Sequence, residues 1–298
     1  MAFPAMGTSV AVMAPVQEAF QALRLIRQLF RSWEGTLSRF IASSDLSRLN
    51  AWTSSDPYPA SPLLRRVLST ALKAAEATAG TFDPAILPAL EMAGYTDDFA
   101  RLPGRRPADA PAGREPGAGV WQLVSLTPEG VRRPFGVRID LGGIAKGMAV
   151  DASLALLREH GIGPTLVNAG GDLAASGPPA GEDSWPISVE GIDGVVVPLR
   201  EGALATSSRR RRHWTVGGEA RHHLIDPATR RPVASSVMSV TVAAGTAAAA
   251  EVAAKTAFIR GEMWGRRFLS ANELAAAFTF EDGSHRSHGL PLIPTEES

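Results

Sequence analysis

Residues that could act on a phosphate group lie together in the segment DLGGIAKGMAVD, Asp140 to Asp151. The residues before it, Gly136 to Asp140, have a β-type pattern, and Ile144 to His160 have a helical one. We therefore expect a strand ending in an acid, a Gly-Gly turn, and a helix with Lys146 in its first turn. A helix N-terminus attracts anions through its N–H groups and dipole, and an ammonium adds to this attraction. The segment suits phosphate, although the same junction is also a common structural turn.

Two further pairs of residues have a chemical and a structural interpretation. His223 and Asp226 fall in a predicted strand that ends in an Asp-Pro turn, where an imidazole could take a proton from a hydroxyl nucleophile. Glu251 and Lys255 are four residues apart on a predicted helix, so they share a face, either as an ion pair or as part of a metal or phosphate site. Taken alone, the residues favour turn and packing roles for the first pair and an ion pair for the second.

The basic run Arg209 to Arg212, followed by His213 and Trp214, could bind nucleic acid, because arginines contact phosphates and an aromatic ring stacks on bases. It could also contact an adenylate group. A run of four in a neutral protein is more often a solvated loop, which is the interpretation we favour. The loop NAGGD, Asn168 to Asp172, fits either a tight turn or a ligand-contacting backbone.

Composition limits the remaining classes of function. With 298 residues and 45% hydrophobic content, the chain can bury a core as one large domain or two close-packed lobes. Thirty basic and 30 acidic residues cancel, so no global field recruits nucleic acid or an acidic membrane. The absence of Cys excludes disulfides, thiolate nucleophiles, iron–sulfur clusters and Cys-based zinc sites. With no membrane-length apolar stretch and no charged leader, we expect a cytoplasmic protein, unless a leader has been removed.

Hydrophobic periodicity and capping signals predict strands grouped into hairpins with helices between them, which favours an α+β fold. We expect helices at 16–35, 62–80, 144–160 and 247–260. We expect strands at 6–14, 121–126, 131–140, 166–168, 185–190, 195–199, 203–207, 237–244 and 276–280. Residues 37–50 are predicted to be a polar connector, and the Pro- and Gly-rich residues 101–119 a surface insertion in a single domain over 1–298.

Taken in order, these segments resemble the ApbE family, the FAD:protein FMN transferases. The matching segments are AMGT at 5–8, LSRF and SDLSRLN within 37–50, TAGTFDPAILPAL at 78–90, DLGGIAKGMAVD at 140–151, NAGGD at 168–172, ATSS at 205–208, HHLIDPATRRP at 222–232, and SVTVAA with AEVAAKTAFIRG within 239–261. Each motif alone is weak, but all of them in this order cover nearly the whole chain.

The resemblance implies an antiparallel-rich α+β architecture of the T-fold type. It also implies that the protein binds FAD, cleaves its diphosphate with Mg2+, attaches FMN to a Thr or Ser hydroxyl of a target flavoprotein and releases AMP. His223 would be the base for that hydroxyl, and Lys146 would neutralise the diphosphate. The positions that would contact FAD are Met6, Phe40, Ala93, Gly94, Tyr95, Asp140, Lys146 and Ile225.

The metal ligands are where the chain departs from the family pattern. The resemblance implies that the carbonyl of Gly143 and the carboxylate of Glu251 bind the metal. Lys255 occupies the position of a Thr ligand, and an ammonium cannot coordinate a cation. Thr256 would reach the metal only if the helix shifted by one residue. Lys255 would otherwise take the place of the cation, which leaves dependence on Mg2+ open.

The leading hypothesis is therefore an FMN transferase whose glycine pair after Asp140, His223 and the helix carrying Glu251 meet at the diphosphate of FAD. One alternative is an FAD-binding carrier or regulator that has lost transfer, and another is an FAD pyrophosphatase. The expected partners are FAD and a target flavoprotein with an acceptor Thr or Ser. We expect no nucleic acid and no membrane span.

Overall fold

The computed structural model describes residues 1–98, 119–216 and 218–295. The chain forms two compact units, each built from separate segments. The first contains Met1–Arg31, Lys146–Ser208 and Ser235–Ser298, and the second contains Ser32–Ala145 and Arg209–Ala234. The predicted surface insertion at 101–119 lies, apart from Gly119, outside the described residues.

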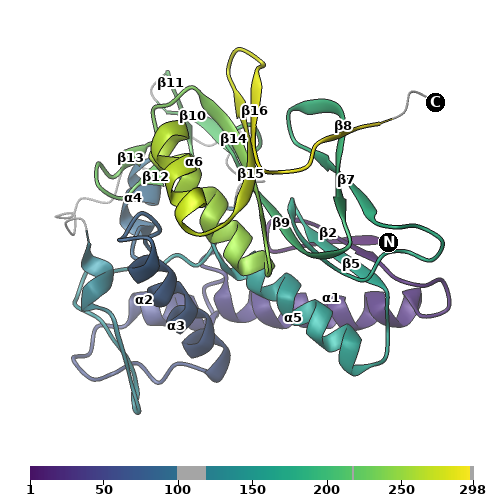
Figure 1. Ribbon diagram of the computed structural model, residues 1–298. Helices are drawn as coiled ribbons and strands as arrows, with labels where there is room; N and C mark the ends of the chain where they lie inside the picture. The colour runs from purple at the N-terminus through teal and green to yellow at the C-terminus, as the bar shows by residue number, and fades with distance from the viewer. Residues whose placement is uncertain (99–118, 217, 296–298) are drawn as a thin grey trace. The chain divides into compact units, whose positions relative to one another are not determined.

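The first unit is built on an eight-stranded antiparallel sheet. Its strands, in spatial order, are β1 (Ala2–Ala5), β2 (Thr8–Met13), β5 (Thr165–Ala169), β6 (Asp172–Ser176), β9 (Glu201–Ser208), β14 (Val237–Ala244), β15 (Ala275–Phe280) and β16 (His285–His288). Helix α6 (Ala247–Ala271) packs on β6, β9, β14 and β15 and runs across them in Figure 1. The helix α5 (Ala145–Glu159) begins at the boundary of this unit.

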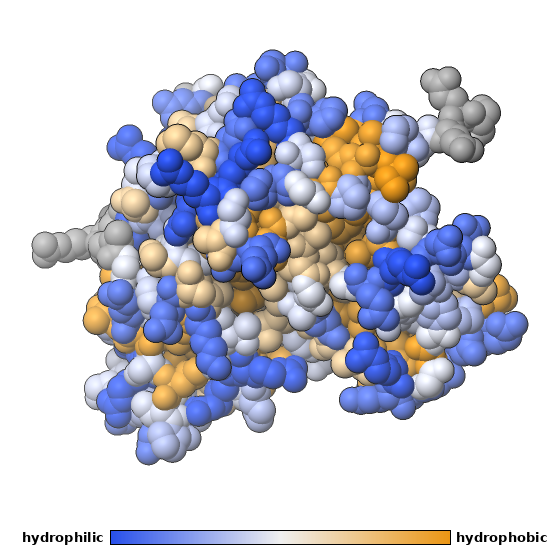
Figure 2. All heavy atoms as spheres, in the orientation of Figure 1, coloured by the Kyte–Doolittle hydropathy of each residue, from blue (hydrophilic) through white to orange (hydrophobic). Residues whose placement is uncertain are grey.

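A smaller sheet packs against the first unit's sheet. It contains β17 (Ile293–Pro294), β8 (Ile192–Leu199) and β7 (Trp185–Val189) in that order. Leu173 and Leu204 of the large sheet share a hydrophobic core with Val197 and Leu199 of β8. Figure 2 shows apolar surface where Figure 1 draws β8, and Ile293 on the neighbouring strand is 47% exposed. Asp172 to Ala175 of β6 are all buried, and because successive side chains point to opposite faces of a sheet, both faces of this central strand are covered.

The second unit holds short helices and two-stranded hairpins around its own core. Its helices are α2 (Asp45–Ala51), α3 (Pro62–Ala77), α4 (Leu87–Met92) and the 3-10 helix η2 (Val120–Leu123). Its hairpins pair β3 (Ser125–Thr127) with β4 (Gly130–Arg132), β10 (His213–Val216) with β11 (Glu219–His222), and β12 (Ile225–Asp226) with β13 (Arg231–Pro232). The helix α1 (Ala19–Leu37) begins in the first unit and ends in the second.

The predicted α+β class is confirmed, and several boundaries follow directly from local signals. The Ser61 side chain caps α3 by accepting from the Leu64 N–H at 3.3 Å, with Pro62 at the first helical position. Gly161, at φ 69°, follows the last turn of α5. Among the described helices, none has the length and hydropathy needed to cross a membrane.

Two predictions for the second unit were wrong. Residues 37–50 are not only a connector, because Ser44 accepts from the Ser47 N–H at 3.0 Å and starts α2. Residues 136–140 form no strand. The Asn50 side chain instead bonds the backbone of Ile139 twice, accepting from its N–H at 2.7 Å and donating to its carbonyl at 2.8 Å. A single amide side chain thus supplies the pairing that a strand would receive from a neighbour.

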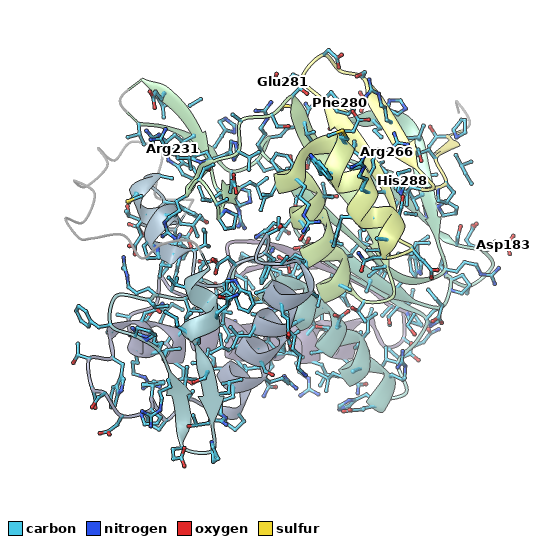
Figure 3. All side chains as sticks on the ribbon, turned by 60° about the vertical axis from the view of Figure 1, so that its left-hand side comes forward. Asp183, Arg231, Arg266, Phe280, Glu281 and His288 are labelled. Atoms are coloured by element: carbon cyan, nitrogen blue, oxygen red, sulfur yellow. The ribbon has the colours of Figure 1, made fainter. Side chains whose placement is uncertain are left out.

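Two features of the first unit add to what was predicted there. The opening strand is a hairpin, since Met6 and Gly7 turn between β1 and β2 at φ 50° and 67°. The predicted end of a helix at Gly261 is confirmed, because Gly261 has the non-helical values φ 70° and ψ 176°; a second helical segment, which α6 includes, follows it to Ala271. Ser270 and His288, whose position on β16 is labelled in Figure 3, then tie the continued helix to that strand at 3.2 Å.

Candidate functional site

A charged cluster lies where α5, α6 and β6 meet in the first unit, and it consists of Lys146, Asp172, Glu251 and Lys255. The Lys146 Nζ lies 2.9 Å from Asp172 Oδ2 and also pairs with Glu251 Oε1. Lys255 follows Glu251 by one helical turn, and its charge acts on Asp172. The two carboxylates are 3% and 4% exposed, so the charges of this cluster are largely shielded from water.

The two helices of the charged cluster cap each other. The Gly147 N–H, in the first turn of α5, donates to Glu251 Oε2 at 2.8 Å. In return, Asp151 of α5 accepts from the N–H groups of Ala247 and Ala248, the first residues of α6, at 2.7 and 3.0 Å. Each N-terminus therefore holds a carboxylate from the other helix, as its dipole favours. The N-terminus of α5, which we expected to bind phosphate, therefore already binds the Glu251 carboxylate.

Close crossing of the helices depends on a glycine. A Cβ at Gly147 would lie 2.6 Å from the backbone oxygen of Ala247 and 2.7 Å from its carbonyl carbon. No side chain fits at such a distance from another backbone. Gly147 thus brings the start of α5 within reach of Glu251, a role that the sequence analysis did not assign to it.

Burial raises the pKa of two carboxylates here, Asp172 and Asp151. Desolvation raises the pKa of Asp172 to about 6, and the charge of Glu251 acts in the same direction against the two ammonium groups. Burial likewise raises the pKa of Asp151, while its two backbone hydrogen bonds oppose the shift. With Asp172 ionised, the cluster has two positive and two negative charges.

An aromatic cluster lies in the second unit and consists of Phe40, Tyr95 and Trp214. The Tyr95 ring centroid is 5.7 Å from that of Phe40 and 5.3 Å from that of Trp214. Ile225 and Ala93 belong to the hydrophobic core beneath these rings. Phe40 and Trp214 are half-buried and offer apolar faces for a planar ring system, whereas Tyr95 is buried and contacts both of them.

Arg39 organises this aromatic cluster. Its guanidinium carbon lies 4.1 Å from the Phe40 centroid and 4.5 Å from the Tyr95 centroid, and its side chain is 7% exposed. Its Nε lies 2.9 Å from Asp140 Oδ2, and the other oxygen of Asp140 accepts from the Gly142 N–H at 2.9 Å. Asp140, predicted to contact FAD, therefore holds the arginine between the rings and fixes the Gly-Gly turn.

The turn of residues 93–95 is covered by β10. The Trp214 indole N–H donates to the Ala93 carbonyl at 2.7 Å. Gly94 has φ 96°, and a Cβ there would lie 2.9 Å from Val216 and 3.0 Å from the Trp214 nitrogen. Glycine is therefore required both by the backbone conformation and by the packing.

His222 and His223 have different surroundings. The buried His222 accepts from the Leu224 N–H at Nδ1 and donates from Nε2 to the Val233 carbonyl, and burial lowers its pKa. His223 is half-buried, and its Nδ1 lies 3.4 Å from the Arg212 carbonyl. Because a carbonyl only accepts, this contact favours a proton on Nδ1 and a lone pair on Nε2. His222 is thus a packed neutral imidazole, and His223 is the one suited to accept a proton.

The candidate residues fall into both units. Those of the second unit are Phe40, Ala93, Gly94, Tyr95, Asp140, Gly143, His223 and Ile225; those of the first are Met6, Lys146, Glu251, Lys255 and Thr256. We expected Gly143, His223 and Glu251 to lie together. These residues belong to different units, so this stays a prediction. Sequence reasoning missed Arg39, although it adjoins Phe40 in LSRF, and it gave Trp214 only a nucleic-acid or adenylate role.

The residues do not fit a divalent metal ion. Mg2+ needs about six oxygen ligands in near-octahedral geometry. Both oxygens of Glu251 already have partners, the Lys146 ammonium and the Gly147 N–H. Thr256 is fully buried and lies about 100° around α6 from Lys255. Among the described residues, no group of three or more His, Cys, Asp or Glu side chains could hold a metal.

Comparison with known proteins identifies the family. The model of the ApbE family matches residues 6–278. The chain belongs to the ApbE family. Curated relatives include an FAD:protein FMN transferase of Vibrio cholerae, 28% identical over 261 residues, which are 84% of this chain and 76% of the relative. Another from Rhodobacter capsulatus is 32% identical over 269 residues, 87% of this chain but 49% of the relative.

Solved ApbE structures share the fold. The ApbE protein of Thermotoga maritima superimposes with a TM-score of 0.82 at 27% identity, covering 97% of this chain and 96% of that one. The antiparallel α+β architecture that the resemblance implied is therefore confirmed for this ApbE chain.

Proposed function

We propose that this chain is an FAD:protein FMN transferase, which cleaves FAD, attaches FMN to a Thr or Ser hydroxyl of a target flavoprotein and releases AMP. Its membership of the ApbE family and the names of its relatives support this proposal. The structural observation that carries it is the charged cluster, which places two lysines beside a helix N-terminus. Their ammonium groups can donate charge-assisted hydrogen bonds to phosphate oxygens.

The two clusters suit different parts of FAD. The aromatic cluster offers the half-buried rings of Phe40 and Trp214, whose faces suit stacking with a flavin or adenine ring, with the buried Tyr95 in contact with both. The charged cluster offers Lys146 and Lys255, whose ammonium groups stabilise the negative charge that grows on phosphoryl oxygens during transfer. Arg39 serves as a positioning residue, because it is held by Asp140 and stacks on two of the rings.

His223 is the proposed general base. Its Nε2 takes the proton of the acceptor hydroxyl as the hydroxyl oxygen attacks the phosphorus of the FMN half. A phosphoester bond to the target forms, the bond from that phosphorus to the bridging oxygen breaks, and AMP leaves with that oxygen. The Arg212 carbonyl, 3.4 Å from Nδ1, orients the imidazole for this step.

The test is FMN transfer followed by intact-mass measurement of a target flavoprotein domain that carries an acceptor Thr. We expect a mass gain of one FMN and an equal amount of AMP. His223→Ala should lower transfer by about 100-fold or more, the typical contribution of a general base, with FAD affinity unchanged. His213→Ala is the matched control, because His213 is an exposed histidine of the same region with a similar carbonyl contact.

The outcomes separate the alternatives. Release of FMN and AMP with no mass gain would indicate an FAD pyrophosphatase. Bound FAD with neither product would indicate a carrier or regulator. If His223→Ala lost FAD binding together with transfer, the histidine would have a structural role and the assignment of the base would be wrong.

A further inference from the structure

Lysine is rare in this chain and concentrated at the charged cluster. Of 30 basic residues, the lysines are Lys73, Lys146 and Lys255, and all the others are arginines. Lys73 is exposed on α3, whereas Lys146 and Lys255 are the partly buried cations of the charged cluster. An ammonium is a compact point charge with three donors, closer to a metal ion in size and geometry than a planar guanidinium.

The Lys146 ammonium is held by carboxylates, as a metal ion would be held. Two buried carboxylates, Asp172 and Glu251, contact it from different elements, β6 and α6. The second oxygen of Glu251 is fixed by the Gly147 N–H at 2.8 Å, so its carboxylate cannot turn toward another cation without losing that bond. Lys255 adds a second positive charge close enough to act on Asp172. A divalent ion would meet repulsion from both ammonium groups.

We propose that Lys146, held between Asp172 and Glu251 and assisted by Lys255, takes the place of a divalent metal ion, so that this chain binds the diphosphate of FAD with protein cations alone. This inference rests on the proposed function. It makes the chain a metal-independent flavin transferase, in which lysine side chains instead of a metal ion contact the diphosphate of FAD.

The first test measures FAD affinity by flavin fluorescence in excess EDTA and in excess Mg2+. We expect the two dissociation constants of the wild-type protein to agree within about twofold. Lys255→Met should weaken FAD binding by about tenfold or more in both buffers, the loss expected for one charge-assisted contact. Lys73→Met is the matched control, because it removes a lysine that is exposed on α3, and we expect no change.

The second test measures metal binding directly. Mn2+ titrations followed by electron paramagnetic resonance should show no stoichiometric binding to the wild-type protein with FAD. The double variant Lys146→Ala with Lys255→Thr removes both ammonium groups and leaves Asp172 and Glu251 without the cation they hold, so it should bind one Mn2+ and bind FAD more tightly when Mg2+ is added. If the double variant does not fold, Lys255→Thr alone and the wild-type titrations still decide the question.

The two proposals fail in different ways. A wild-type protein that binds FAD tenfold more tightly with Mg2+, or that binds one Mn2+, overturns the metal-independent assignment and leaves the proposed function standing. A protein that binds no FAD in either buffer overturns the proposed function, and the assignment of Lys146 and Lys255 falls with it.

Discussion

The substitution Gly147→Ala tests whether α5 and α6 cross as closely as the charged cluster requires. The new Cβ would lie 2.6 Å from the Ala247 oxygen and 2.7 Å from the Ala248 nitrogen, whereas ordinary contact begins at 3.4 Å. All these atoms are backbone, so no side-chain rotation relieves the overlap and the helices must separate by nearly an ångström. Overpacking of this kind costs about 1–3 kcal/mol of the free energy of unfolding.

A gain in helix propensity opposes this cost. Alanine in place of glycine stabilises a helix by about 0.5–1 kcal/mol, so we expect a net loss of about 1–2 kcal/mol. Gly35→Ala is the matched control, because Gly35 lies within α1 and a Cβ there would meet nothing within 4 Å. That variant should be more stable than the wild-type protein by up to about 1 kcal/mol.

The assay is urea unfolding followed by circular dichroism, with midpoints compared at equal slopes. The separation of the helices should also stretch the bond from the Gly147 N–H to Glu251, so Gly147→Ala should bind FAD more weakly than Gly35→Ala. If both variants gained stability equally, α5 and α6 would not cross at this distance, and the geometry of the charged cluster would be wrong.

Two further predictions concern the charged and aromatic clusters. The pKa of Asp172 is about 6 in the folded chain and 3.8 in the unfolded chain, so the folded chain binds its proton more tightly. The stability that this proton contributes is therefore full below pH 3.8 and is lost as pH rises through about 6. Asp172→Asn should therefore flatten the fall in the free energy of unfolding across this window, a fall of up to about 3 kcal/mol in the wild-type protein, as measured by urea unfolding. Trp214→Phe leaves the Ala93 carbonyl without its donor, so it should cost about 1–2 kcal/mol and reduce the quenching of tryptophan fluorescence by FAD.

Local signals in the sequence located much of the fold. The Ser61-Pro62 start of α3 and the alternation of β14 depend on neighbouring residues, and both elements lie where they were predicted. The start of α2 also had a local signal, the N-cap residue Ser44. The segment was predicted to be a connector because many of its residues are polar. The residues around Ile139 were predicted to form a strand because their hydrophobic pattern is typical of one. Their backbone hydrogen bonds at Ile139 are made with the side chain of Asn50 and not with a neighbouring strand.

The contacts of the candidate site could not be read in the same way. Gly147 and Glu251 are 104 residues apart, and no local pattern specifies that one caps the other. The i,i+4 spacing of Glu251 and Lys255 concerns one helix, whereas no local spacing indicates that Glu251 pairs with the ammonium of Lys146 on another helix. The resemblance to the ApbE family supplied the residues, and only tertiary packing shows which cation each carboxylate holds.

The measurement that tests the central claim most directly is the intact mass of a target flavoprotein domain after incubation with this chain and FAD in excess EDTA. We expect the target to gain the mass of one FMN, and a target whose acceptor Thr is replaced by Val to gain none. An unchanged mass in EDTA and in Mg2+ alike would contradict the assignment of this chain as a flavin transferase.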